Sequence, residues 1–322
     1  MFQYKSSFAQ TNLIYNGDFE LYDTCPISVS TPSSYQLNTC LGWYVPTYAT
    51  SDYFNTCASG TTVAVPNGTI GYQWPYSGNA YCGVVIQYYA QSPLPVDNGW
   101  WVEYIQSRLS SPLKAGYEYE FSCRVVLSDL LHDYAFWKFG ASFSQYSITK
   151  SDAKPFMNIV PQVMNTPNNF ITDTLNWVEI KGKFIAQGAE EYITLGFFID
   201  TLAPDTLRQI TGFPIDPTNT GGYYFIDACS LIETGKIYEY PNVFSPNDDG
   251  KNDEWNPKNY TDGDVVKIYN RWGVLVEELN SKEDSWDGRT TSGQECSMGT
   301  YFFVIINDNE SIANKGFIQL VR

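Results

Sequence analysis

Apolar side chains alternate with polar ones over several short runs of this chain, and this period of two residues is the feature that most constrains its fold. In the run 117–127 every second residue is apolar or aromatic: Tyr117, Tyr119, Phe121, Cys123, Val125 and Leu127. Such alternation places these side chains on one face of an extended strand. Residues 177–184 form a second amphipathic run, and the runs 192–199 and 223–226 are apolar enough for buried strands. The pattern predicts an all-β protein.

Composition supports the same fold class. Phe, Trp and Tyr make up 16% of the residues, and 24 Gly and 17 Pro separate the strand-like runs. Aromatic residues favour strands, whereas frequent Gly and Pro interrupt any helix longer than two or three turns. The sequence contains no run of about 18 apolar residues, so it predicts no membrane-spanning helix.

The chain is acidic throughout. Its formal net charge is −16, and the segments on both sides of residue 236 contribute to it. A uniformly acidic surface repels phosphate groups, so the charge argues against nucleic acid or anionic lipid as a partner. The same surface favours solubility outside the cell and offers carboxylate oxygens to calcium.

Residues 1–9 resemble the end of a signal peptide. A small residue, Ala9, precedes Gln10 at the expected cleavage position. A complete signal peptide would also have an apolar core of about 7–15 residues, which is missing here. We therefore interpret residues 1–9 as a signal-peptide remnant, and we expect an exported protein.

Cysteine usage agrees with export. Six cysteines precede residue 236, namely Cys25, Cys40, Cys57, Cys82, Cys123 and Cys229, and Cys296 follows it. An even number of cysteines in one domain of an exported chain suggests disulfides. We predict the pairs Cys25–Cys57 and Cys40–Cys82, since all four residues lie in turn-rich sequence. Cys123 lies in a strand pattern, where a buried thiol and a bridge are equally compatible with the sequence.

The sequence pattern changes near residues 234–240, which we take as a domain boundary. We expect a jelly-roll β-sandwich at 10–236 and a small immunoglobulin-like β-sandwich of about seven short strands at 237–322. Four apolar runs follow the boundary, at 265–270, 274–279, 301–306 and 316–321. In the run 301–306 both alternating sets of residues are apolar, which predicts a strand covered on both faces.

The last part of the chain contains five motifs in a fixed order. They are VFSPNDDGKND (243–253), VKIYNRWG (266–273), WDG (286–288), GTYFFVI (299–305) and KGFIQLVR (315–322). Together they resemble the gliding motility-associated C-terminal domain of Bacteroidetes surface proteins, which is the type B sorting domain of the type IX secretion system. The family commonly has Pro-Asn-Gly-Asp-Gly where this chain has Asp248 in place of the first Gly, and Cys296 is an addition.

The resemblance implies that residues 237–322 act as a sorting signal that is read in the folded state. The outer-membrane translocon would pass the protein, and a β-barrel shuttle protein would hold the C-terminal domain. Contact would involve the last strand, through edge pairing or surface complementarity, by Lys315, Gly316, Phe317, Ile318, Gln319, Leu320, Val321 and Arg322. The alternative is an ordinary terminal β-sandwich without a sorting role.

An acidic loop in the first of these motifs is a weaker calcium candidate. Asp248, Asp249 and Asp253 cluster around Gly250, as oxygen ligands do in calcium loops, but the spacing is not that of an EF-hand. The alternative is an Asx turn, in which the carboxylates accept hydrogen bonds from nearby backbone N–H groups.

The N-terminal domain begins with NLIYNGDFE (12–20) and ends with GYYFIDACSL (222–231). These segments resemble the first and last strands of galactose-binding-like jelly rolls and of many carbohydrate-binding modules, which lie side by side. The resemblance implies a structural calcium ion held by Glu20 and Asp227, although Ala228 stands where a second Asp is usual. The alternative is that both carboxylates are solvated residues at strand ends.

The middle of this domain resembles an uncharacterised Bacteroidetes surface domain that often precedes sorting or anchoring modules. The motifs are GWY (42–44), SDYFNTC (51–57), VPN (65–67), GYQ (71–73), GNAY (78–81) and YIQ (104–106). The resemblance implies a location rather than an activity.

Aromatic residues in loop-like sequence are the candidates for ligand binding. They are Trp43, Tyr44, Tyr72, Trp74, Tyr76, Trp100 and Trp101. Aromatic rings stack on the apolar faces of sugars, so we predict a glycan-binding or adhesive protein associated with gliding motility. The main alternative is a structural component of the gliding or surface apparatus that binds proteins only.

Catalysis is the least favoured function. A Ser-His-Asp site would have to use the single histidine, His132, which Asp129 and Asp133 flank, and no nucleophile motif accompanies it. A hydrolase with two carboxylates is a further alternative, but no pair stands out in the sequence. We therefore expect a protein that is not an enzyme.

Overall fold

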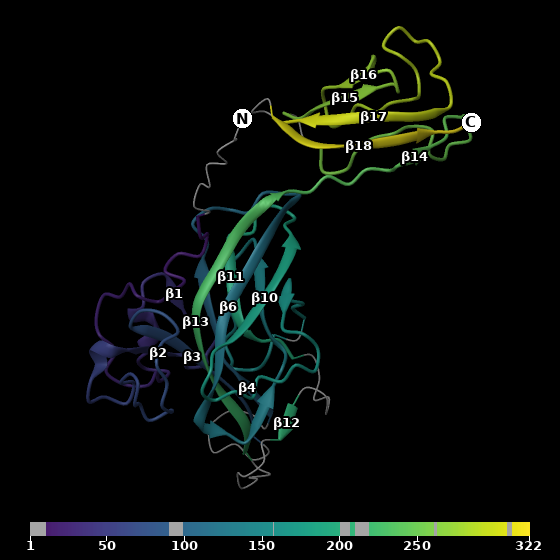
Figure 1. Ribbon diagram of the computed structural model, residues 1–322. Helices are drawn as coiled ribbons and strands as arrows, with labels where there is room; N and C mark the ends of the chain where they lie inside the picture. The colour runs from purple at the N-terminus through teal and green to yellow at the C-terminus, as the bar shows by residue number, and fades with distance from the viewer. Residues whose placement is uncertain are drawn as a thin grey trace. The chain divides into compact units, whose positions relative to one another are not determined.

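The computed structural model describes residues 11–89, 99–156, 158–199, 207–209, 219–260, 263–307 and 311–322. The chain divides into two compact units, Met1–Gly235 and Lys236–Arg322 (Figure 1). In the described residues the only helices are the 3-10 turns η1 (Gln36–Thr39) and η2 (Thr56–Ala58), and all other regular structure is strand. No helix in this part of the chain is long and apolar enough to cross a membrane. The protein is all-β, as the alternation predicted.

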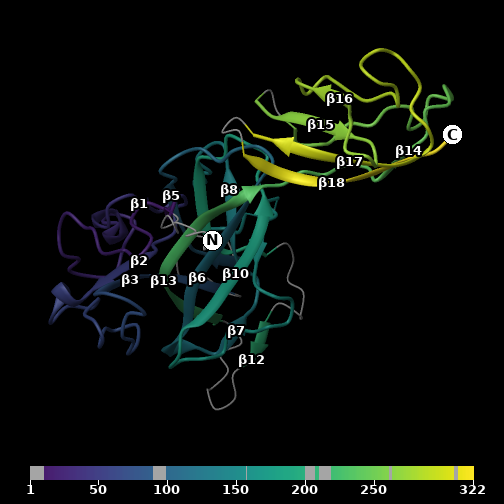
Figure 2. The same cartoon turned by 45° about the horizontal axis from the view of Figure 1, so that its top comes forward.

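The N-terminal unit is a β-sandwich of jelly-roll type (Figures 1 and 2). Its five-stranded sheet has the order β1 (Trp43–Tyr44), β5 (Tyr104–Arg108), β11 (Tyr192–Phe197), β8 (Phe139–Ser144) and β9 (Val163–Met164). Its six-stranded sheet has the order β10 (Val178–Ile185), β6 (Tyr117–His132), β13 (Asn219–Lys236), β3 (Ala80–Tyr89) and β2 (Asp52–Asn55), with β4 (Gly99–Val102) also paired to β3. Strand β12 (Leu207–Gln209) pairs with β7 (Tyr134–Phe136).

Alternation along the strands fills the space between the two large sheets. On β6 the predicted apolar set from Tyr119 to Leu127 is buried, and on β10 Ile180 and Phe184 are buried while the residues between them are more exposed. These side chains join those of the five-stranded sheet in one continuous core. Both amphipathic runs predicted from the sequence are therefore confirmed.

The six-stranded sheet is also covered on its outer face. Phe54, Tyr81 and Phe225 pack there as an aromatic group, with ring centroids 5.0–5.3 Å apart. The connection between β2 and β3, residues 56–79, lies over this group and contributes Ala58 and Val63 to it. Because both faces are covered, the run 223–226 is apolar at every position, as expected of a buried strand.

The segment 12–20 lies beside the end of β13, as the jelly-roll resemblance implied. The N–H of Leu13 donates to Leu231 O at 2.9 Å, and the N–H of Cys229 donates to Gly17 O at 2.7 Å. The side chain of Asn12 forms two further hydrogen bonds with β13. Its amide N–H donates to Cys229 O, and its carbonyl oxygen accepts from the N–H of Leu231. The segment forms no named strand, because it meets its neighbours only at single positions.

The C-terminal unit contains one five-stranded sheet. Its order is β14 (Val243–Phe244), β18 (Ile312–Leu320), β17 (Gly299–Ile306), β15 (Val265–Tyr269) and β16 (Leu275–Leu279), with β14 parallel to β18 and the other pairs antiparallel. Irregular segments cover one face of this sheet and supply Trp255 and Trp286, both fully buried. The described part of this unit therefore has five strands rather than about seven, since much of the second layer is irregular.

The prediction that residues 301–306 are covered on both faces is wrong. Tyr301, Phe303 and Ile305 are buried, whereas Phe302 is 49% exposed and the other outward residues are half-buried. Phe302 faces Phe317 of β18 across the ladder, and Phe317 is 52% exposed. Two large side chains thus lie opposite each other on the outer face of the ladder, which gives an apolar pattern without a covering layer.

Candidate functional site

The structure divides the seven predicted ligand-binding aromatics into two groups. Trp43 and Trp101 are buried, and their indole N–H groups donate to Asn16 O at 2.8 Å and to Glu103 Oε1 at 3.3 Å. The prediction is wrong for these two residues, because they are part of the packed interior. Trp100 is half-buried against Phe136. Tyr44 is also half-buried, and its hydroxyl donates to a glutamine side chain of β5.

The remaining three aromatics are exposed together on one short segment. Tyr72 is 51%, Trp74 56% and Tyr76 49% exposed, whereas Gln73 between them is buried. The indole N–H of Trp74 donates to the Tyr72 hydroxyl at 3.1 Å, so these two side chains lie on the same side of the segment. Trp177, which directly precedes β10, joins this group through its indole N–H, which donates to Trp74 O at 3.0 Å. We call Tyr72, Trp74, Tyr76 and Trp177 the aromatic ridge.

Trp177 was not predicted as a site residue. In the sequence it reads as the first residue of an amphipathic strand, and only the fold brings it beside Trp74. No local signal in the sequence marks this contact.

Backbone hydrogen bonds hold the ridge from beneath. The N–H of Gln73 donates to Pro66 O at 2.8 Å, and the hydroxyl of Tyr81 donates to Gln73 O at 3.1 Å. At one end of the ridge, the N–H of Tyr72 donates to Asp129 on β6 at 2.8 Å. A segment fixed at this many points presents its rings with little loss of freedom on binding.

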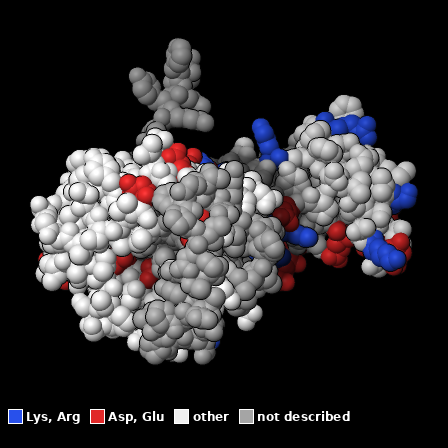
Figure 3. All heavy atoms as spheres, turned by 90° about the horizontal axis from the view of Figure 1, so that it is seen from below, with Lys and Arg blue, Asp and Glu red and all other residues white. Residues whose placement is uncertain are grey.

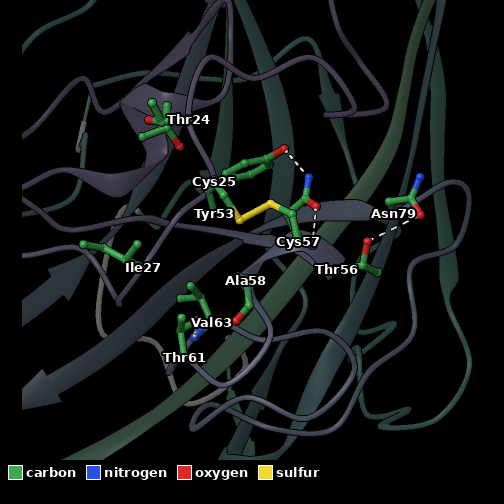
Figure 4. Close-up of a disulfide and its surroundings, with 12 residues drawn as sticks. Thr24, Cys25, Ile27, Tyr53, Thr56, Cys57, Ala58, Thr61, Val63 and Asn79 are labelled. Carbon is green, nitrogen blue, oxygen red and sulfur yellow. Dashed lines mark hydrogen bonds between the residues drawn. A yellow bond between two sulfur atoms is a disulfide. The ribbon is translucent and has the colours of Figure 1, made fainter.

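A disulfide anchors the connection that carries the ridge (Figure 4). Cys25 is bonded to Cys57, with Cα atoms 6.0 Å apart, which is one of the two pairs that we predicted. Beside it the N–H of Cys57 donates to the side chain of Asn55, and the N–H of Thr56 donates to Asn79 O at 3.0 Å. The connection is therefore tied at its base as well as along its length.

An ion pair lies beside one ring of the ridge. The guanidinium of Arg124 lies 4.6 Å from the centre of the Tyr76 ring and forms an ion pair with Glu179 at 2.9 Å. Such a cation–π contact fixes the orientation of the ring. Among the described residues on the face shown in Figure 3, Lys and Arg form separate spots and not a continuous basic surface.

Glu20 and Asp227 hold the turn that follows the ridge. Glu20 Oε1 accepts from the N–H groups of Asn79 and Ala80 at 2.6 and 2.9 Å. Asp227 Oδ2 accepts from the N–H groups of Tyr76 and Ser77 at 2.8 and 3.1 Å. Asp227 is fully buried, so neither carboxylate is free at a strand end.

A calcium ion at Glu20 and Asp227 would need more oxygen ligands than these two side chains provide. Backbone N–H groups already approach the oxygens of Glu20 and Asp227, and the described residues contain no group of three or more His, Cys, Asp or Glu side chains able to hold a metal ion. Calcium usually takes six to eight oxygen ligands. The pair does not form a calcium site by itself, and calcium here stays a prediction.

Burial gives Asp227 a testable pH dependence. Desolvation, with a smaller contribution from the charge of Glu20, raises the pKa of Asp227 from 3.8 to about 7. Between these values the folded state retains a proton that the unfolded state has lost, so the free energy of unfolding falls as the pH rises from about 4 to about 7. For Asp227 alone the fall is on the order of 4 kcal/mol.

We expect Asp227→Asn to remove this part of the slope in urea unfolding curves measured at pH 4.5, 6 and 7.5. A fall in the free energy of unfolding remains in the variant, because burial also raises the pKa of Asp52, to about 8. An unchanged slope would show that Asp227 does not titrate in this range.

The acidic loop of the C-terminal unit is an Asx-turn structure. Asp253 accepts hydrogen bonds from the N–H groups of Asn247, Asp248 and Gly250 at 2.7–2.9 Å, and these bonds hold the pKa of Asp253 below its usual value. Asp249 accepts likewise from the N–H of Lys251 at 2.8 Å. These hydrogen bonds are the ones expected of an Asx turn, which was the alternative to a calcium loop. Calcium at Asp248, Asp249 and Asp253 stays a prediction.

The eight residues predicted to contact the secretion machinery have different positions. Ile318 and Leu320 are buried in the core of the unit, and Gln319 and Leu320 are already paired with β14. Gly316 lies under the Phe303 ring, where an added Cβ would come within 2.7 Å of it. Arg322 donates to Cys296 O at 2.6 Å. Lys315, Phe317 and Val321 are exposed.

The open edge of β18 is therefore shorter than the sequence suggested. In the described residues its part Ile312–Phe317 pairs with β17 on one side only, whereas β14 covers the following residues. Edge pairing with a partner is available at 312–317 and not along the whole of 315–322.

A buried carboxyl pair was not predicted. Asp52 and Glu103 are 4% and 2% exposed, and Tyr223 donates its hydroxyl to Asp52 at 2.6 Å. Glu103 accepts from the N–H groups of Thr50 and Val85 at 3.0 Å. Both carboxyl groups are closed to solvent and hydrogen-bonded inside the N-terminal unit, so this pair is not placed to act on a substrate. The side chain of His132 lies outside the described part of the structure.

These features define an all-β protein with an aromatic surface on its N-terminal β-sandwich and a separate C-terminal β-domain. Residues 238–320 match the family described as CHU_C Type IX secretion signal domain. The C-terminal unit thus carries a signal for export by the type IX secretion system, across the outer membrane to the cell surface or the extracellular space. The resemblance noted in the sequence is confirmed for this unit. No curated protein matches the chain.

Several solved structures show weak similarity to the chain. One is PorZ, a surface component of the type IX secretion system of Porphyromonas gingivalis, with 19% identity and a TM-score of 0.23, covering 30% of this chain and 14% of PorZ. Another is the CBM22-1 xylan-binding domain of Xyn10C from Paenibacillus barcinonensis, with 13% identity and a TM-score of 0.33, covering 61% and 88%. The K1 adhesin domain of the P. gingivalis Lys-gingipain has 9% identity and a TM-score of 0.29, covering 61% and 92%. At these scores none of them indicates a ligand for this chain.

Proposed function

We propose that this protein binds a glycan at the cell surface through the aromatic ridge. The observation that carries the proposal is the exposure of Tyr72, Trp74 and Tyr76 at alternate positions of one short segment, with Gln73 buried between the first two. Aromatic rings bind the C–H faces of pyranose sugars, and a row of rings suits successive sugars of a chain. Buried hydrogen bonds hold the segment, so its exposed rings are not the result of a loose loop.

Polar groups beside the rings supply the hydrogen bonds that sugar hydroxyls require. The indole N–H of Trp74 donates to the hydroxyl of Tyr72 at 3.1 Å, and among the described residues this hydroxyl has no acceptor, so it can donate to a ligand. Arg124 and Glu179, paired beside Tyr76, provide a donor and an acceptor. A surface that combines apolar rings with a few polar groups is typical of carbohydrate recognition.

Trp74→Ala tests the proposal. Loss of a large ring that a ligand covers costs about 1.5–3 kcal/mol, which corresponds to a roughly 10- to 100-fold weaker Kd. The measurement is a glycan array with the wild-type chain, followed by calorimetry on the best ligand. Tyr146→Ala is the matched control, because Tyr146 is 73% exposed and lies outside the ridge. This variant should bind the glycan with the affinity of the wild type. Equal affinities of wild type and Trp74→Ala would refute the ridge as the binding site.

A second proposal is a purely structural or protein-binding role in the gliding or surface apparatus. The exposed pair Phe302 and Phe317 on the C-terminal unit supports it, since exposed aromatic pairs are common at protein interfaces. A pull-down from cell envelopes compares the wild type with Phe302→Ser/Phe317→Ser. Loss of a protein partner from the variant supports this role, because the variant leaves the glycan-binding ridge unchanged.

We also propose that a shuttle protein reads the folded C-terminal unit at the open edge 312–317. Lys315 and Phe317 are exposed there, and this stretch has a pairing strand on one side only in the described residues. Main-chain pairing at such an edge gives affinity, and the exposed side chains give specificity.

A further inference from the structure

Four thiols lie inside the N-terminal unit in addition to the Cys25–Cys57 disulfide. Cys40, Cys82, Cys123 and Cys229 are each at most 2% exposed, and all four belong to the core between the two sheets. None of them is bonded in the structure, so the predicted Cys40–Cys82 bond is not formed there.

The first two thiols lie close together in the core. Cys82 on β3 lies opposite Tyr53 on β2, and the Tyr53 hydroxyl donates to Phe19 O at 2.8 Å. The thiol of Cys40 approaches the same carbonyl oxygen, at 3.9 Å, so Cys40 and the Tyr53 side chain opposite Cys82 converge on one backbone group. The irregular N-terminal segment thus brings Cys40 onto the central strand that carries Cys82.

The other two thiols lie on neighbouring strands. Cys123 belongs to the inward-facing set of β6, and β13 lies next to β6 in the sheet. On β13 the inward set changes from even to odd numbers after Ile226, because Ala228 adopts a positive φ of 51° in the manner of a β-bulge. This change turns Cys229 into the core. The Tyr119 hydroxyl donates to Glu233 and the Thr234 hydroxyl donates to Glu118 O, and the same alignment of β6 and β13 places Cys229 opposite Cys123.

The environment of these thiols limits when they can react. Burial raises the pKa of Cys82 and Cys229, and each gains a further increase from its neighbouring cysteine. The thiolate is the reactive form in disulfide exchange, so Cys82 and Cys229, one member of each pair, are unreactive once the core has closed. Oxidation would therefore occur while the chain folds.

We propose that the exported protein contains two further disulfides, Cys40–Cys82 and Cys123–Cys229. The type IX secretion signal directs the chain out of the reducing cytosol, and oxidising compartments favour disulfides. For each pair the two thiols lose two protons and two electrons to a protein or small-molecule disulfide, which is reduced to two thiols. One bond joins the N-terminal segment to β3, and the other joins β6 to β13, so the two bonds close the core of the six-stranded sheet.

The test is a thiol inventory of the full chain collected from the cell surface or medium. The protein is unfolded without reductant and treated with iodoacetamide, then reduced and treated with N-ethylmaleimide, and the labels are located by mass spectrometry. We expect iodoacetamide on Cys296 alone and maleimide on the other six cysteines. Unreduced digests should contain Cys40–Cys82 and Cys123–Cys229 peptides. Iodoacetamide on the four core cysteines, or a Cys82–Cys229 peptide, would overturn the proposal.

A variant provides a second readout. Cys123→Ala alone should leave Cys229 open to iodoacetamide in the unfolded chain, whereas Cys123→Ala/Cys229→Ala should restore the pattern of a single labelled cysteine. Dithiothreitol should lower the urea midpoint of the wild type more than that of the double variant. Equal shifts would overturn the second bond, and if the variants fail to fold, the inventory of the wild type decides.

Discussion

Removal of residues 237–322 is expected to leave the N-terminal unit in the periplasm and to abolish its delivery to the cell surface. The deleted part matches a type IX secretion signal domain almost over its whole length, so the chain loses the signal that the machinery reads. The remaining unit has its own continuous core and keeps all the strands of its two large sheets. The measurement is immunodetection of the N-terminal unit in periplasmic, surface and medium fractions, with proteinase K treatment of intact cells.

The control for this deletion is transfer of the signal. Residues 237–322 fused to an unrelated periplasmic protein should carry it to the surface or the medium. Surface delivery of the truncated chain at the wild-type level would contradict the assignment of export to the C-terminal unit. Periplasmic retention together with normal glycan binding would separate the export function from the function of the ridge.

Trp286→Ala is expected to unfold the C-terminal unit in the otherwise intact chain. The indole is fully buried, with ring centroids 5.1 Å from Phe244 and 4.9 Å from Tyr301. Its N–H donates to Arg289 O at 2.7 Å. Removal of a buried Trp costs about 3–5 kcal/mol, which is a large part of the stability of a unit this small.

Trp272→Ala is the matched control, because Trp272 is 81% exposed. Urea unfolding of the isolated unit 236–322 and surface delivery of the full chain should both fall for Trp286→Ala and remain unchanged for Trp272→Ala. If the signal is read as a folded domain, the two measurements should fall together. Normal delivery of a chain whose C-terminal unit is unfolded would show that the signal is read as a linear sequence.

The strands were the part of the fold that the sequence predicted best. Along 117–127 each inward residue alternates with a residue that contacts solvent or the outer layer, so the local pattern alone determines the face. The C-terminal signal was predicted for a different reason, since its five ordered motifs resemble those of a known family, and residues 238–320 match that family.

The site depends on distant contacts, and for this reason it was predicted only in part. Trp43 and Trp74 occur in similar loop-like sequence, yet Trp43 is buried beside Phe19, 5.0 Å between ring centroids, while Trp74 is exposed. The difference in burial depends on whether a segment distant in the sequence packs on the ring. In the same way, the roles of Glu20 and Asp227 as acceptors for the turn after the ridge follow from a contact between residues far apart in the chain.

The connection 56–79 has a consequence for how proteins of this kind diversify. It leaves β2 at Asn55 and returns at Ala80, two residues that face each other across the ladder, so its length is not constrained by the sheets. A replacement needs to restore the apolar contacts of Ala58 and Val63 on the outer face, a partner for Cys25, and hydrogen-bond donors for the buried Asp227 carboxylate. One contiguous insertion could therefore be exchanged in evolution to change what the protein recognises, while the scaffold beneath it and the export signal are inherited unchanged.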